Sequence, residues 1–203
     1  SDAGSAFYVV SQAIRLKQNQ RYITSGAIAT MGFTLPAAIG TSVANNKGTV
    51  LAVTGDGSFQ QNIQELQVMY HHNLPIKLFV MNNGGYFSIR KTESRYFDGR
   101  FVGESEESGL SFPETSAIAG AYKIPYLKVS TVEDCEKSLA KFVQMPGPGI
   151  VEVMLNKDIE IIPTNASLMR ADGIMVSKPL EDMYPFLPRE EFAENMIIRP
   201  ISE

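Results

Sequence analysis

Two polar side chains that could bind a metal ion each follow a short apolar stretch of the chain. Asp56 lies in a Gly-Asp-Gly-Ser turn (residues 55–58), and Asn83 belongs to an Asn82-Asn83 pair that follows the next apolar stretch. Carboxylate and amide oxygens are hard ligands that suit Mg²⁺ or Ca²⁺, and Mg²⁺ usually completes its shell with phosphate oxygens and water. The glycines beside Asp56 permit a sharp turn and a close approach of the backbone to a ligand. The pattern therefore indicates a site for a metal-bound diphosphate.

The apolar stretches before these two groups predict buried strands. Residues 49–54 and 76–81 are rich in Val, Ile and Phe and are bounded by Gly, Pro and Asn, which is typical of buried parallel strands. Residues 58–70, between them, predict a helix. In such a unit Asp56 and Asn83 both lie at the carboxyl edge of the sheet, where ligands of open α/β sheets bind. An isolated Gly-Asp-Gly is weak evidence, because this sequence also makes ordinary tight turns. The Asn pair at the end of the second strand favours the binding site over an ordinary turn.

The alternation of helix and strand continues through the first 156 residues. Further helices are expected at 5–17, 34–45, 84–95, 112–122 and 131–145, and further strands at 126–129 and 149–155. Ser111 and Thr131 are the expected N-caps of the last two helices. Residues 97–111, rich in Gly, Ser and Glu, predict a loop. The alternation predicts an α/β fold, a doubly wound parallel sheet with helices on both faces.

The composition changes after Asn156. Prolines recur at positions 163, 179, 185, 188 and 200, and the apolar residues are scattered. We therefore expect a diphosphate- and metal-binding domain over residues 1–156 and an extended tail over residues 157–203, packed on the domain or on a neighbour. Residues 1–4 resemble the end of a strand, so we also expect the chain to be a fragment of a longer protein.

Composition excludes several classes of function. The formal net charge is −4, with 22 acidic and 18 basic residues and no basic block, so nucleic acid is not an expected partner. No apolar run approaches the ~18 residues that a transmembrane helix needs, so no membrane partner is expected. The single cysteine, Cys135, fits a reducing compartment and hence a cytoplasmic location. The chain lacks G-x-G-x-x-G and P-loop motifs, which argues against other nucleotide-binding folds.

The Gly-Asp-Gly turn followed by the Asn pair resembles the signature of thiamine diphosphate enzymes. The matching segments are GDGSFQQNIQEL (55–66) and LPIKLFVMNN (74–83), and the segments YITSG (22–26) and TMGFTLPAAIG (30–40) agree as well. Over residues 1–157 the chain closely resembles the diphosphate-binding domain of the acetolactate synthase and 2-oxoacid decarboxylase group. The resemblance implies thiamine diphosphate and Mg²⁺ as cofactors, and no motif in the chain indicates FAD.

The resemblance also implies roles for single residues. The implied metal ligands are Asp56, Asn83 and the main-chain carbonyl of Gly85, while Asn82 is expected to hold the loop. The expected cofactor contacts are Gly4, Ser5, Ala29, Met31, Gly55, Gly57, Ser58 and Ile89. The N–H groups that open the helix after Asp56, and the first turn of the helix at 5–17, are suited to an anion such as the diphosphate.

Two of these assignments have ordinary alternatives. Met31 is similar to the bulky apolar residue that wedges beneath the cofactor in this family and bends it into a V shape, and Ala29 and Met31 would contact the pyrimidine through the backbone. The alternative is a core methionine. Ile89 falls where relatives place an apolar side chain near the thiazolium, and the alternative is the core of a helix.

The family activates its cofactor with a glutamate from a separate pyrimidine-binding domain, supplied across a dimer interface. We therefore expect no catalytic residue in this chain and no activity of the chain alone. Activity would need the pyrimidine-binding domain, in a homodimer or tetramer. The resemblance implies a transferase or lyase that acts on a 2-oxoacid by decarboxylation and carboligation, as acetolactate synthase does. Thr92 stands where such synthases commonly carry a tryptophan that shapes the choice of acceptor, so an unusual 2-oxoacid or a sugar-like acceptor is possible. A 2-oxoacid decarboxylase or oxidase of the same family is an alternative. A non-catalytic Mg²⁺–diphosphate module is the alternative from another class.

Overall fold

The computed structural model describes residues 1–170 and 172–198 and contains two compact units, Ser1–Ile159 and Glu160–Glu203. Residue 171 and residues 199–203 of the expected tail lie outside the described residues. The first unit holds the parallel sheet. No helix among the described residues has the length and apolar character needed to cross a membrane.

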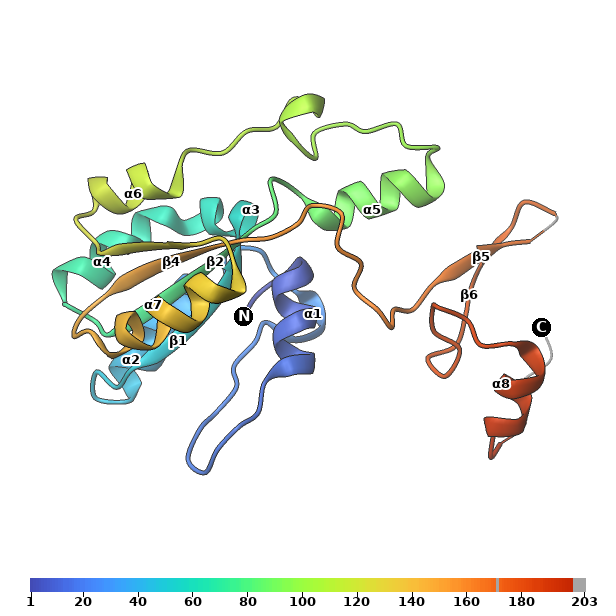
Figure 1. Ribbon diagram of the computed structural model, residues 1–203, viewed down its shortest axis with the longest axis horizontal. Helices are drawn as coiled ribbons and strands as arrows, with labels where there is room; N and C mark the ends of the chain where they lie inside the picture. Colours follow the sequence, from blue (N-terminus) through green and yellow to red (C-terminus); the bar gives the residue numbers. More distant parts are fainter. Residues whose placement is uncertain (171, 199–203) are drawn as a thin grey trace. The chain divides into compact units, whose positions relative to one another are not determined.

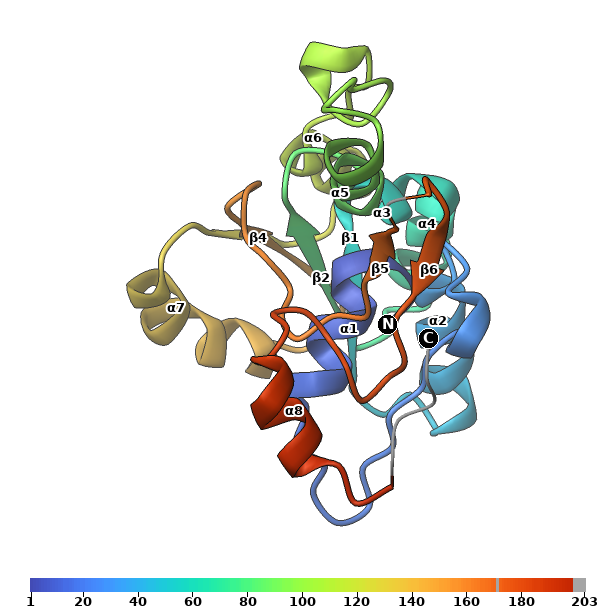
Figure 2. The same cartoon turned by 90° about the vertical axis from the view of Figure 1, so that its right-hand side faces the viewer.

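Four strands form one parallel sheet in the first unit (Figures 1 and 2). Their order is β1 (Val50–Gly55), β2 (Ile76–Asn82), β4 (Gly149–Met154) and β3 (Tyr126–Val129). The register pairs Gly55 with Met81 and Asn82 with Met154. The carboxyl ends of β1, β2 and β4 therefore meet at one edge of the sheet.

Helices cover both faces of this sheet. On one face α2 (Thr34–Ala44), α4 (Leu66–His71) and α6 (Thr115–Ala121) bury apolar side chains against the strands. On the other face α7 (Val132–Gln144) packs Phe142 against β3 and β4, and the partly buried Cys135 belongs to the same cluster. Burying apolar surface on both faces is what drives this layered arrangement. The structure confirms the predicted parallel α/β fold.

The expected helix at 58–70 is wrong in detail, because the helical path is interrupted. It comprises α3 (Asp56–Phe59), the 3₁₀ segment η2 (Gln60–Glu65) and α4, with Asn62 at φ −143° and ψ 33°. The Asn62 amide donates to the Gly32 carbonyl at 2.8 Å, so this side chain bonds a distant loop at the break in the helix.

Three other predicted helices begin or end elsewhere. The helix expected at 5–17 is α1 (Gly4–Ala13), which stops before the extended residue Ile14. The helix expected at 84–95 is α5 (Phe87–Tyr96), because Gly84 and Gly85 both have positive φ. Ser111 is not an N-cap, since Pro113 disfavours helical backbone at the residue before it and α6 begins only at Thr115. The expected N-cap Thr131 is confirmed, because its hydroxyl accepts the Asp134 N–H at 3.1 Å.

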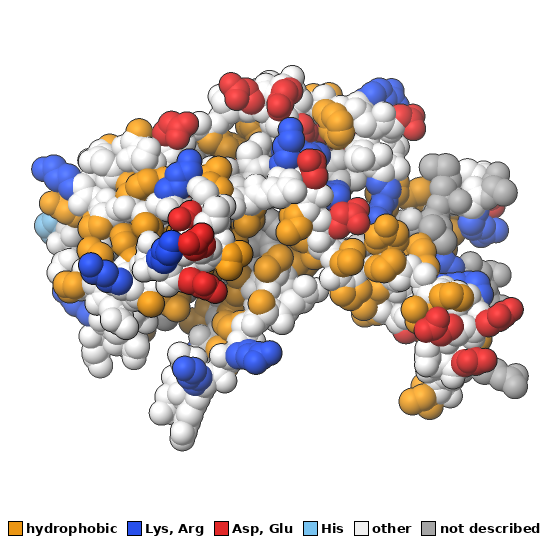
Figure 3. Space-filling view, in the orientation of Figure 1, with side chains coloured by type: hydrophobic (Ala, Val, Ile, Leu, Met, Phe, Trp, Pro, Cys, Tyr) orange, Lys and Arg blue, Asp and Glu red, His pale blue; other side chains and the backbone are white. Residues whose placement is uncertain are grey.

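Residues 97–111 form the predicted loop, which contains one short 3₁₀ turn, η3 (Glu106–Ser108). A further 3₁₀ turn, η1 (Gly26–Ile28), lies in the loop between α1 and α2. Acidic and basic side chains are interspersed over the face of the molecule shown in Figure 3, without a large block of one sign.

The second unit has regular elements of its own. Strands β5 (Ser167–Met169) and β6 (Met175–Ser177) form an antiparallel pair, and α8 (Arg189–Asn195) follows. The buried Asp182 accepts two hydrogen bonds from the Arg189 guanidinium, at 2.8 and 2.9 Å. Scattered apolar residues and prolines had predicted an extended tail here, and the structure adds a hairpin and a short helix to it.

Candidate functional site

The Asp56 carboxylate joins the two halves of the motif. Asp56 directly follows β1, and its side chain is buried at the carboxyl edge of the sheet. One carboxylate oxygen accepts the neighbouring Gly57 N–H at 2.9 Å. The other accepts the Gly85 N–H, from the turn after β2, at 3.0 Å. The two strand ends that the sequence suggested would meet are therefore in contact through this one side chain.

The electrostatics of Asp56 suit a cation. Burial raises the pKa of this carboxyl above its ordinary value, and backbone N–H groups of Gly85, Gly57, Gly84 and Asn83 lower it in part. Within the described part of the chain, no lysine or arginine forms an ion pair with Asp56. A buried carboxylate is costly unless an opposite charge or a metal balances it. Mg²⁺ fits these donors, because it favours one or two protein oxygens together with phosphate oxygens and water.

The Asn pair after β2 serves two purposes. Asn83 is buried beside Asp56, and its backbone N–H contributes to the field at that carboxylate. The Asn82 side chain instead holds the turn, because its oxygen accepts the Gly84 N–H at 3.0 Å. Its amide donates to a Glu152 oxygen of β4 at 2.7 Å. The turn that contains Asn83 is thus attached to the neighbouring strand.

Gly85 occupies a position that only glycine fits. Its φ is +142°, and a Cβ there would lie 1.9 Å from the main-chain oxygen of Glu104. The adjacent Tyr86 N–H donates to that same oxygen at 2.8 Å. The contact packs loop 97–111 directly against the turn. Metal binding by the Gly85 carbonyl stays a prediction.

The loop with Ala29 and Met31 lies against the Gly-Asp-Gly-Ser turn. The Ser58 hydroxyl accepts the Gly32 N–H at 3.1 Å, which fastens this loop beside Asp56. Ala29 has left-handed backbone, with φ 49°, and the Met31 side chain is 39% exposed. An exposed methionine is not a core residue of this unit, so the surface that Met31 presents is available to a ligand. The wedge role of Met31 stays a prediction.

The first turn of α1 lies next to α5. A Cβ on Gly4 would lie 3.7 Å from the Ser88 hydroxyl oxygen, and Ile89, the next residue of α5, is 42% exposed. Ile89 therefore is not buried in the helix core of this unit. The contacts of Gly4, Ser5 and Ile89 with a cofactor stay predictions.

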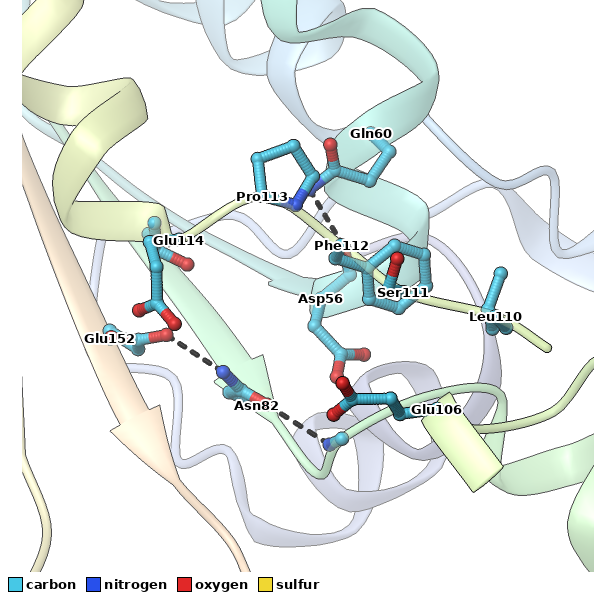
Figure 4. A pocket seen from close by; sticks show the side chains of 12 residues that line it. Asp56, Gln60, Asn82, Glu106, Leu110, Ser111, Phe112, Pro113, Glu114 and Glu152 are labelled. Atoms are coloured by element: carbon cyan, nitrogen blue, oxygen red, sulfur yellow. Dashed lines mark hydrogen bonds between the residues drawn. The ribbon is translucent and has the colours of Figure 1, made fainter. Parts of the chain in front are cut away.

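A cavity of about 280 Å³ opens beside Asp56 (Figure 4). Asp56, Asn82 and Glu152 line it from the ends of the strands, and residues 110–115 line it from the other side. The dashed lines of Figure 4 show Asn82 bonded to Glu152 and to the turn. The cavity is thus rich in carboxylate and amide oxygens.

Three further residues at this edge were missed from the sequence. The fully buried Asp2 accepts hydrogen bonds from the Thr34 N–H at 3.3 Å and the Thr54 hydroxyl at 3.1 Å, which tie the first residues to α2 and β1. Glu152 and Glu104 are also buried. An acidic residue inside the apolar strand 149–154 is a signal that could have identified Glu152. Asp2 and Glu104 carry no such local signal.

The fold and the site together define a parallel α/β domain with an oxygen-rich ligand site at the carboxyl edge of its sheet, where such domains bind their ligands. Residues 2–153 match the family model described as thiamine pyrophosphate enzyme, C-terminal TPP binding domain. The chain therefore belongs to this family, and the resemblance noted in the sequence is confirmed.

The curated relatives that the chain matches include acetolactate synthases. The chain is 32% identical over 157 residues to acetolactate synthase 2, chloroplastic, from Zea mays, a match that covers 75% of this chain and 25% of the relative. It is 30% identical over 155 residues to the acetolactate synthase large subunit from Cyanidium caldarium, covering 76% and 26%. For acetolactate synthase, chloroplastic, from Arabidopsis thaliana the identity is 32% over 157 residues, covering 75% and 23%. The chain thus spans about a quarter of the length of these relatives.

Proposed function

We propose that this chain is the diphosphate- and Mg²⁺-binding domain of a thiamine diphosphate-dependent enzyme that acts on 2-oxoacids by decarboxylation and carboligation. The observation that carries the proposal is the buried Asp56 carboxylate, which accepts N–H groups from both halves of the motif without an ion-pair partner among the described residues. Membership of the family and the similarity to acetolactate synthases support the same conclusion.

Under this proposal Asp56, Asn83 and the Gly85 carbonyl hold Mg²⁺. The N–H groups that open α1 and α3 orient the diphosphate, since the first N–H groups of a helix lack intrahelical partners and favour an anion. The exposed side chain of Met31 would support the rings of the bound cofactor. When bound, thiamine diphosphate supplies the carbon nucleophile and the electron sink for 2-oxoacid chemistry.

The activating glutamate belongs, in this proposal, to a pyrimidine-binding domain elsewhere in the same enzyme. Catalysis then requires a homodimer or tetramer in the cytoplasm, and the chain is inactive alone. A decarboxylase or oxidase would use the same site with a different acceptor. A non-catalytic module would bind the cofactor and leave 2-oxoacids unchanged.

Calorimetric titration of thiamine diphosphate with and without Mg²⁺ tests the proposal, in the longest natural form of the protein that contains this chain. We expect binding that requires Mg²⁺. Asp56→Asn should weaken it at least about tenfold, a change of ~1.4 kcal/mol. Glu136→Gln is the matched control, because Glu136 is exposed on α7.

Two other results would change the conclusion. Failure of a form that includes the glutamate-bearing domain to bind the cofactor would overturn the assignment. Mg²⁺-dependent binding without CO₂ release from any of a panel of 2-oxoacids would favour the non-catalytic module. Thermal unfolding of each variant shows whether a loss of binding reflects a loss of the fold.

A further inference from the structure

A partly buried ion pair between Arg90 and the buried Glu104 contacts the turn that carries the proposed metal ligands. Arg90 of α5 donates from Nε to a Glu104 carboxylate oxygen at 2.5 Å, and the two side chains are 13% and 5% exposed. Burying two charges costs free energy unless the pair is close and its remaining polar atoms are bonded. The other hydrogen bonds of Arg90 and Glu104 therefore determine whether the pair stabilises the turn.

The Arg90 guanidinium connects three segments that are distant in the sequence. Besides Glu104, it donates from Nη1 to the Lys157 carbonyl at 3.1 Å, after β4. It also donates from Nη2 to the Gly84 carbonyl at 3.4 Å, inside the turn itself. A lysine could not reproduce this set of contacts, because its three donors share one nitrogen, whereas the guanidinium spreads five donors over a rigid plane.

Glu104 makes the matching contacts from loop 97–111. Its second carboxylate oxygen accepts the Ser105 hydroxyl at 2.6 Å, and the Ser108 hydroxyl lies 3.4 Å away. Its main-chain oxygen accepts the Tyr86 N–H at 2.8 Å and occupies the space that a side chain at Gly85 would need. Glu104 thus contacts the turn through its main-chain oxygen, and its side chain holds Arg90 in place.

We propose that Arg90 and Glu104 are positioning residues for the metal site, a proposal that rests on the function proposed above. Neither residue contributes an atom to the ligand set. Together they fix the backbone of residues 83–86, and hence the direction of the Asn83 side chain and the Gly85 carbonyl. Loop 97–111 is part of the support of the site, so cation binding and loop order are linked. Linkage is reciprocal: ordering the loop strengthens cation binding to the same extent that the cation orders the loop.

The test uses the longest natural form of the protein and three variants. Arg90→Lys keeps the charge and loses the spread of donors, and Glu104→Gln keeps the shape and loses the charge. Lys137→Ala is the control, because it breaks the exposed Glu133–Lys137 pair on α7. Hydrogen–deuterium exchange of residues 85, 86 and 97–111 is followed without ligand and then with Mg²⁺ and thiamine diphosphate. The Mg²⁺ concentration that gives half-maximal cofactor binding is measured in parallel.

We expect faster exchange at Gly85, Tyr86 and the loop in Arg90→Lys and Glu104→Gln, even without ligand. We expect the Mg²⁺ midpoint to rise by about 10- to 100-fold, as for other groups that orient metal ligands. At saturating Mg²⁺ the cofactor affinity should return close to that of the unmodified protein, which separates positioning from loss of the site. Lys137→Ala should change none of these quantities.

Two results would overturn the inference: unchanged exchange at residues 85 and 86 in both variants, or an unchanged Mg²⁺ midpoint with faster loop exchange. The second would leave Arg90 and Glu104 as a structural pair of the loop alone. If the unmodified protein shows no Mg²⁺-dependent binding, the proposed function fails instead. Exchange at residues 85 and 86 without ligand then still decides whether the pair holds the turn.

Discussion

At the scale of single residues, the turn beside Asp56 is closed by aromatic packing. The Tyr86 and Phe112 rings meet edge to face, with centroids 5.6 Å apart, over the backbone of Gly57. A Cβ on Gly57 would lie 2.2 Å from Tyr86 Cε1 and 3.1 Å from Phe112 Cζ. Glycine is therefore required at position 57 because the two rings leave no space for a side chain, and not only because of the geometry of the turn.

Gly57→Ala should destabilise the protein by about 1–3 kcal/mol, the usual cost of adding a methyl group to a packed position. The Tyr86 ring would have to move, which also disturbs the backbone beside Gly85. Gly40→Ala is the matched control, since a Cβ on this helical glycine of α2 meets nothing within 4 Å. It should leave stability unchanged or raise it by up to ~1 kcal/mol. Urea unfolding measures both, and equal effects would contradict the packing argument.

The sequence indicated the residues that follow strand ends and not the buried residues that hold them. The positions of Asp56 and Asn83 at the carboxyl edge of the sheet could be predicted, because each residue stands directly after an apolar stretch that forms a strand. Asp2 could not, since its partners Thr34 and Thr54 lie 32 and 52 residues away in the sequence. Such contacts depend on tertiary structure, which local patterns do not encode.

At the scale of elements, one buried carboxylate ties the strands of the sheet together at the site. Glu152 of β4 accepts from Asn82 at the end of β2 and from the Tyr126 hydroxyl of β3. Burial alone would raise the pKa of Glu152, but hydrogen bonds from Tyr126, Asn82 and Thr115 outweigh it and hold the pKa below its ordinary value. Burial and the adjacent Glu152 carboxylate raise the pKa of the Tyr126 hydroxyl, so Tyr126 stays a donor.

Glu152→Gln should cost about 1–3 kcal/mol at pH 7, because one charge-assisted hydrogen bond is lost and the new amide group faces a hydroxyl donor. The folded-state pKa of Glu152 is depressed, so its contribution is present above the unfolded value of about 4.3. The contribution is lost as the pH falls through the folded pKa. The difference between the two proteins should therefore shrink below pH 4. Urea unfolding at pH 7 and pH 3 measures it, with the exposed Glu133→Gln as control.

A difference that is the same at both pH values would mean that shape, and not charge, sets the cost of the substitution.

Helix and strand positions were predictable from the apolar pattern, and β3 was predicted at its observed residues. Helix continuity was not predictable at Asn62, because the hydrogen bond to Gly32 that accompanies the break comes from a loop 30 residues earlier.

At the scale of the whole molecule, the chain divides into two compact units, Ser1–Ile159 and Glu160–Glu203. The side chains of β6 in the second unit are exposed or partly buried, whereas β2 of the first unit is largely buried. Asp182 is buried there and pairs with Arg189 at 2.8 Å and with Lys178 at 3.8 Å, both within the same unit. Hydrogen bonds from Arg189 hold the pKa of Asp182 below its ordinary value, against the effect of burial. One ionised carboxylate thus connects the residues before α8 to the helix.

Asp182→Asn should loosen the second unit and leave the first unit intact. Losing a hydrogen bond to a charged group costs about 1.5–3 kcal/mol, so the open form of residues 160–198 should become roughly 10- to 100-fold more populated. When opening is fast relative to cleavage, proteolysis reports that population. Limited proteolysis at pH 7 with mass spectrometry should show faster cuts after residue 160 and unchanged cuts before it. Glu181→Gln, at the exposed neighbouring position, is the control. Faster cleavage throughout residues 1–159 as well would contradict the prediction that the effect of Asp182→Asn is confined to the second unit.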